Sequence, residues 1–182
     1  MNSFYTKLQE SLDQGHPVML ATSVDCLVEF SDSYDVLIAQ KAFLCQDELT
    51  AETPSMASFW QAIFASTPEE IPNVIPQDTW WTFYDELEHP FPDGVLKKLA
   101  AGEALVLATV IAKASSAPDC AGAKLAVDQS GTLYGTLGDS AVDAEVAQTA
   151  QSVWEEGTPR LLECSKTDKS GHALRILLEP IN

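Results

Sequence analysis

The residues best suited to chemistry form a short polar stretch in the second half of the chain. They are Gly135, Thr136, Gly138, Asp139, Ser140 and Asp143. A glycine-containing turn from a strand into a helix points backbone N–H groups outward, where the positive helix end can receive a phosphate. Asp139 and Asp143 oppose this, because carboxylates in the first turn satisfy those donors and repel an anion. A self-capped helix without ligand and an anion-binding turn both remain open.

Three further residues are candidates for the same site. Ser115 and Ser116 follow an apolar strand, beyond whose end α/β folds often bind ligands, and an ordinary polar loop is the alternative. Lys124 belongs to a small set of basic residues and could contact a phosphate or oxo group, unless it is a solvated surface lysine. An enzyme that uses Asp139, Asp143 and Glu145 would need a cleft with perturbed acids.

The cysteines and histidines provide no metal or catalytic motif. The four cysteines lack a C-x-x-C pair, which predicts reduced and mostly buried thiols; they are Cys26, Cys45, Cys120 and Cys164. The three histidines are isolated, and no nucleophile elbow, Walker loop or dinucleotide fingerprint occurs. We therefore expect no metal and no catalytic residues.

The charge of the chain excludes several partners. Acidic residues number 27 against 10 basic ones, which gives a net charge of −17 and argues against binding nucleic acid or an anionic membrane. A hydrophobic content of 46% predicts a compact globular protein. No apolar run reaches the roughly 18 to 20 residues that span a bilayer, so a soluble, cytoplasmic protein without membrane contact is expected.

The elements that would position these residues occur twice. Residues 4–22 align without a gap with residues 91–109, each as a helix that ends at a glycine and leads into a strand. The strands are expected over residues 17–24 and 104–112. The stretch 88–94, rich in proline and glycine, suits a boundary. We therefore predict a duplication, with units over 1–88 and 89–182.

The rest of each unit follows a looser parallel. Short strands over 27–30 and 36–39 are matched with strands over 124–127 and 132–136. A helix containing Trp60 is matched with a helix over 141–156, which Ser140 and Asp143 would open as a capping box. Trp80 and Trp81 fit either a closing strand or a protein-docking surface. The predicted fold is α/β or α+β, with two helix-plus-small-sheet units in one compact, pseudo-dimeric body of unknown oligomeric state.

A series of short motifs in the second unit resembles a known family. In order they are G-E-x-x-x-L-A-T-V, S-S-A-P, G-A-K, G-T-L-G, G-x-P-R-L-L and a closing L-L-E-P. They are similar to the N-terminal domain of the XdhC/CoxI family, accessory proteins of molybdenum hydroxylases such as xanthine dehydrogenase. The resemblance implies a chaperone that binds the molybdenum cofactor, protects it during sulfuration and delivers it to the hydroxylase. It also places Ser115 and Ser116 in a cofactor-facing loop.

The sequence departs from the family where cysteines are usual. The G-G-G-C-V-E turn of the family is replaced by residues 138–143, with Ala141 in place of the cysteine and Asp143 in place of the glutamate. A later C-G-G is replaced by residues 170–172. Two functions follow: an accessory protein that binds molybdenum cofactor, a molybdenum hydroxylase or another maturation protein, or a non-catalytic interaction module that has lost the cofactor site.

Overall fold

The fold alternates helices with antiparallel strands. A computed structural model describes residues 3–28, 33–67, 70, 79–85, 91–111, 120–167 and 173–182. In the first half lie α1 (Ser3–Asp13), β1 (Met19–Val28), β2 (Ser33–Cys45), β3 (Glu48–Ala51), a 3-10 turn (Pro54–Met56), α2 (Ala57–Ala65) and β4 (Thr79–Asp85). In the second lie α4 (Val95–Ala101), β5 (Leu105–Ile111), β6 (Lys124–Asp128), β7 (Leu133–Gly135), α5 (Ser140–Glu156), β8 (Arg160–Thr167) and β9 (Ala173–Ile181). The expected mixed helix-and-sheet class is confirmed.

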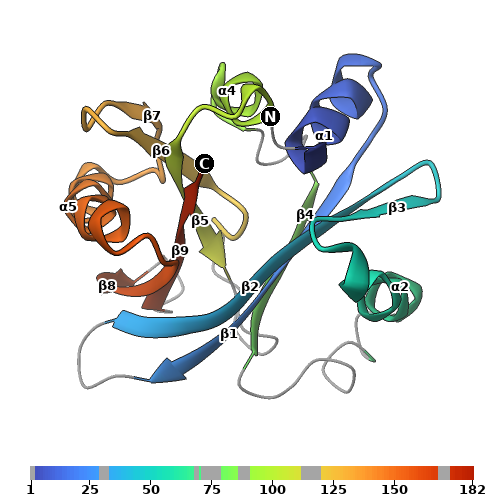
Figure 1. The fold of residues 1–182 in the computed structure, drawn as a ribbon. Helices are drawn as coiled ribbons and strands as arrows, with labels where there is room; N and C mark the ends of the chain where they lie inside the picture. Colours follow the sequence, from blue (N-terminus) through green and yellow to red (C-terminus); the bar gives the residue numbers. More distant parts are fainter. Residues whose placement is uncertain are drawn as a thin grey trace.

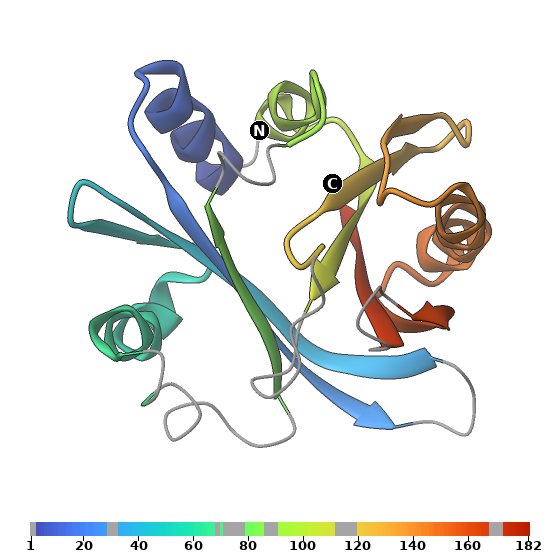
Figure 2. The same ribbon diagram turned by 180° about the vertical axis from the view of Figure 1, so that it is seen from behind.

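All described strands belong to one antiparallel sheet that runs through both halves. Its order is β4-β1-β2-β8-β9-β5-β6-β7, and β3 pairs with β2. The two halves join where residues 33–35 of β2 pair with residues 160–162 of β8. The long ribbon of β1 and β2 crosses the strands of the second half at a steep angle (Figures 1 and 2). The two small sheets expected from sequence are therefore continuous.

Strand pairing follows the same order in each half. In the first half β1 lies between β4 and β2, and β2 also pairs with β3. In the second half β5 lies between β9 and β6, and β6 also pairs with β7. The boundaries of the two units, 1–88 and 89–182, remain a prediction.

The looser part of the internal alignment is wrong in the first half. The segments expected as separate strands over 17–24 and 27–30 belong, as far as Val28, to the single strand β1. An irregularity between Asp25 and Cys26 shifts the register, which lets β1 continue pairing with β2 past a polar stretch. The strand of the first half that is equivalent to β6 is therefore β2, and not residues 27–30. Residues 29–32 lie outside the described part.

One hydrophobic core lies beneath α1 and α4, which lie side by side on one face of the sheet (Figures 1 and 2). Its buried members come from both halves: Phe4, Tyr5, Leu8, Val18, Leu20, Phe43, Cys45, Phe91, Val95, Leu96, Leu99, Leu105, Leu107, Ala126 and Ile181. On the opposite face, α5 packs on β5, β6, β8 and β9. Each half thus completes the core of the other.

Local sequence accounts for the ends of these elements. Gly102 adopts φ 79° and ends α4, and Gly157 adopts φ 67° and ends α5, as left-handed cap residues do. The strand β5 is buried along its whole length, as its apolar run predicts. Trp80 and Trp81 lie in β4, and their side chains are outside the described part. None of the described helices is long and apolar enough to span a membrane.

Candidate functional site

The predicted site residues of the second half lie in the turn between β7 and α5. Gly135 ends β7 with φ 87° and lies against the linker, where an added Cβ would lie 2.8 Å from the Pro92 Cβ. A side chain there is excluded both by the left-handed backbone and by this close approach. Gly138 adopts φ 91° and redirects the chain toward α5, with open space around its Cα. The two glycines are therefore required for different reasons.

Two carboxylates organise the start of α5. Asp139 is the N-cap, and its Oδ1 accepts hydrogen bonds from the backbone N–H groups of Ala141 at 2.8 Å and Val142 at 3.3 Å. Asp143 accepts from the Thr136 hydroxyl at 2.6 Å and from the Leu137 backbone N–H at 2.8 Å. The turn and the first turn of the helix are thereby tied together.

The expected capping box is corrected by this geometry. The helix begins at Ser140, one residue earlier than predicted, and the capping side chain is that of Asp139 rather than that of Ser140. Asp143 reaches back to the turn preceding the cap and not to the N–H of Ser140. Aspartate and serine are both favoured N-cap residues, so sequence alone did not decide between Asp139 and Ser140.

The turn does not fit a phosphate in this arrangement. The N–H groups of Leu137, Ala141 and Val142 donate to carboxylates, and the N–H of Gly138 donates to the Thr136 hydroxyl at 3.0 Å. Phosphate binding at a helix N-terminus needs such donors to be available. Here three of these four donors already donate to the chain's own carboxylates, and the fourth donates to a hydroxyl.

The side chain of Lys124 lies on the face of the sheet opposite α5. On β6, Leu125 and Val127 face α5, whereas Ala126 faces α1 and α4. Because side chains alternate along a strand, Lys124 shares the face of Ala126. Its ammonium is buried, donates to the Gly122 carbonyl at 3.1 Å and lies 5.1 Å from the centre of the Phe91 ring. Lys124 is therefore a buried lysine rather than the solvated surface lysine that was the alternative, and its role in a site stays a prediction.

The remaining candidates contribute no described metal centre. Ser115 and Ser116 lie outside the described residues. Cys45 and Cys164 are buried free thiols. Burial, and to a smaller extent the nearby Glu145 carboxylate, raises the pKa of Cys164 to about 12. Within the described residues, no three histidine, cysteine or acidic side chains gather as metal ligands would.

A buried charge cluster was missed from the sequence. Lys41 on β2 and Glu179 on β9 form an ion pair, with the Lys41 Nζ 2.5 Å from the Glu179 Oε1. Glu52 adds a second carboxylate 3.4 Å from the same nitrogen. Burial alone would lower the pKa of Lys41, but Glu179 and Glu52 outweigh it and raise this pKa well above its usual value. The pair fixes one half of the chain against the other.

Comparison with known proteins agrees with the motifs of the second half. Residues 98–165, somewhat more than a third of the chain, match the model of the XdhC and CoxI family. This match runs from the second half of α4 through most of β8 and includes the turn between β7 and α5. No curated protein matches the chain. Residues 98–165 of the chain are therefore similar to a segment of the XdhC and CoxI family.

Proposed function

We propose that this chain is a non-catalytic accessory protein in the maturation of a molybdenum hydroxylase. It acts by contacting the enzyme or another maturation protein, not by holding the molybdenum cofactor at the turn between β7 and α5. The family match supports the accessory role. The observation that carries the second part is the occupation of the turn's backbone donors by Asp139 and Asp143.

Electrostatics explain why this observation favours protein contact over cofactor binding. A phosphate at the start of α5 would have to displace Asp139 or Asp143 from backbone N–H groups that already have charged acceptors. It would also lie within a few ångströms of both carboxylates, where each repulsion costs about 1 kcal/mol in water and about 4 kcal/mol near a protein surface. Lys124 would not offset this cost, because its side chain faces the opposite side of the sheet.

The acidic character of the chain is consistent with a protein partner. A net charge of −17 favours fast association with a basic surface and discourages association with polyanions. We therefore expect the hydroxylase or maturation protein that it contacts to present a basic region, and the complex to weaken as salt is raised.

The experiment removes the chain from cells that make a molybdenum hydroxylase and compares enzyme activity per enzyme molecule and molybdenum content. We expect the hydroxylase to accumulate with reduced activity, and the wild-type chain to restore it. Asp143→Asn, which removes a charge from the turn while keeping an acceptor, should restore activity equally well. Unchanged hydroxylase activity in the absence of the chain would overturn the accessory role.

Pull-down assays separate the two parts of the proposal. The purified chain should retain the hydroxylase at low salt and lose it at high salt, with Asp143→Asn behaving as the wild type. If only the wild-type chain and not Asp143→Asn restored hydroxylase activity in the cells, the function would lie in the turn. That result would contradict the claim that the turn has a structural role.

A further inference from the structure

The two halves place equivalent residues at equivalent positions, which permits a comparison of their local packing. Thr22 of β1 lies opposite Lys41 of β2, and Thr109 of β5 lies opposite Lys124 of β6. All four of these polar side chains are buried. In both halves a threonine and a lysine therefore occupy the same place in the central hairpin.

Following the strand registers identifies the next equivalent pair. Phe43, two residues beyond Lys41, lies opposite Thr50 of β3. Ala126, two residues beyond Lys124, lies opposite Tyr134 of β7. Thr50 and Tyr134 are therefore equivalent, and both sit on the face of the sheet that α1 and α4 cover.

In the second half, Tyr134 fills the space between the helix α4 and its hairpin. The Lys98 ammonium lies 5.5 Å from the centre of the Tyr134 ring, and the Tyr134 hydroxyl donates to the Asp128 carboxylate at 3.0 Å. Lys98 also pairs with Glu103 at 2.6 Å. In this half the space between the helix and the hairpin is thus filled by an aromatic ring whose hydroxyl donates to a carboxylate.

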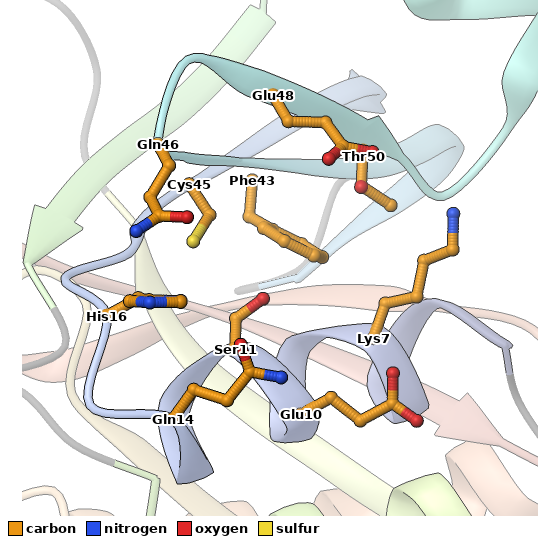
Figure 3. Close-up of a pocket in the computed structure, with 10 residues that line it drawn as sticks. All are labelled: Lys7, Glu10, Ser11, Gln14, His16, Phe43, Cys45, Gln46, Glu48 and Thr50. Carbon is orange, nitrogen blue, oxygen red and sulfur yellow. The ribbon is translucent and has the colours of Figure 1, made fainter.

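In the first half, smaller residues replace this filling. Thr50 stands in place of Tyr134, and the helix alignment puts Ser11 in place of Lys98. Between α1 and the β2–β3 hairpin lies a pocket of about 280 Å³. Its lining is drawn in Figure 3: Lys7, Glu10, Ser11, Gln14, His16, Phe43, Cys45, Gln46, Glu48 and Thr50. The pocket lies where the second half holds its own tyrosine.

We propose that this pocket, the α1–hairpin pocket, binds a small aromatic compound that carries hydroxyl or amino donors and no negative charge. Its volume is just below the roughly 300 to 1,000 Å³ of pockets for drug-sized ligands, which suits a compound with one ring. The ring of Phe43, most of which is buried in the core against Phe4, lines the pocket and in Figure 3 points toward α1.

The polar lining determines the charge and the hydrogen bonding of the ligand. Glu10 and Glu48 supply two carboxylates that accept from hydroxyl or amino groups, and Lys7 supplies one ammonium. With histidine neutral, the formal charge of the lining is therefore negative, which disfavours carboxylate ligands. His16 adds a second ring on the side of the α1–β1 connection.

The test is a titration of the full-length chain with three probes, followed by nuclear magnetic resonance. Tyramine combines a phenol with an ammonium group, 4-hydroxyphenylacetate combines the phenol with a carboxylate, and cyclohexylmethylamine has the charge without the aromatic ring. We expect saturable binding of tyramine that shifts signals of Phe43 and Thr50, and at least about tenfold weaker binding of the other two, which corresponds to 1.4 kcal/mol.

The decisive variant is Thr50→Tyr, which gives the first half the filling of the second. It should reduce tyramine affinity at least about tenfold, whereas Gln148→Tyr, on the exposed face of α5, should leave it unchanged. Ser11→Lys supplies a second variant if Thr50→Tyr does not fold. No saturable tyramine binding up to its solubility limit, or binding that both pocket variants leave unchanged, would overturn the proposal.

Discussion

Breaking the buried ion pair between Lys41 and Glu179 should strongly destabilise the fold. The two residues are 138 positions apart in the chain, and both are buried. The Lys41 Nζ lies 2.5 Å from Glu179 and 3.4 Å from Glu52, whereas the second Glu179 oxygen has no hydrogen-bond partner within the described residues. Glu179 therefore depends mainly on Lys41 for its compensation, with Lys124 as a weaker second cation, whereas Lys41 also has Glu52.

The geometry sets different costs for the two single substitutions. Lys41→Met leaves two carboxylates without the ammonium between them and should lower the free energy of unfolding by about 3 to 5 kcal/mol. Glu179→Leu leaves Lys41 with Glu52 and should cost less, about 1.5 to 3 kcal/mol. The double variant replaces the pair by apolar groups, so its stability should lie close to that of the wild type. With a double variant close to the wild type, the coupling energy is then at least about 4 kcal/mol.

The assay is urea denaturation of the four proteins, monitored by circular dichroism and by the fluorescence of tryptophans such as the buried Trp60. The pH dependence provides an independent check on Lys41→Met. Burial already raises the pKa of Glu179 in the wild type although the Lys41 ammonium lowers it, so removing the ammonium raises this pKa further and the folded variant binds more protons. The loss in free energy of unfolding caused by Lys41→Met should therefore shrink as the pH falls from about 8 to about 5. This range lies above the pKa of roughly 4.3 that a glutamate has in the unfolded chain.

Additive effects of the two substitutions would refute this reasoning. A coupling energy below about 1 kcal/mol is typical of a solvent-exposed pair and would mean that Lys41 and Glu179 do not depend on each other. A pH-independent deficit of Lys41→Met would likewise show that no buried carboxylate is left uncompensated.

Three further substitutions or titrations test the turn and the core. Gly135→Ala should destabilise more than Gly138→Ala in urea denaturation, because both incur left-handed strain of about 1 to 2 kcal/mol but only the first adds a clash with Pro92; equal costs would contradict the close approach. Asp139→Ala should cost about 1 kcal/mol and Asp139→Asn much less, since Asn also caps helices; equal losses would show that the cap is unimportant. Because burial raises the pKa of Cys164 from 9.0 to about 12, its thiol should resist a thiol reagent at neutral pH until the protein unfolds. For the same reason stability should fall as the pH rises from about 9 toward 12, because the folded state holds the proton longer, and rapid modification of native Cys164 would contradict its burial.

Elements defined by local patterns were predictable from the sequence. The helix expected over 141–156 is observed from Ser140 to Glu156, because its apolar spacing and the terminal Gly157 are local signals. The strand expected over 104–112 is observed from Leu105 to Ile111 for the same reason.

Features that depend on distant pairing were not predictable. The length of β1 and β2 follows from their mutual register and from the irregularity between Asp25 and Cys26, which breaks the alternation that would reveal one strand. The burial of Lys41 and Lys124 depends on partners from other strands and helices, whereas a lone lysine in a sequence is normally exposed. The choice of Asp139 over Ser140 as the cap depends on the φ and ψ angles that Gly138 permits before it.

The most direct test of the central claim is a cofactor-retention experiment. The purified chain is mixed with freshly released molybdenum cofactor and gel-filtered, and the protein peak is assayed for pterin by fluorescence after oxidation, with a cysteine-containing XdhC protein in parallel. Because Asp139 and Asp143 already accept from the donors of the turn, we expect the pterin to elute with the control protein and not with this chain. Stoichiometric pterin in the peak of this chain would contradict the account.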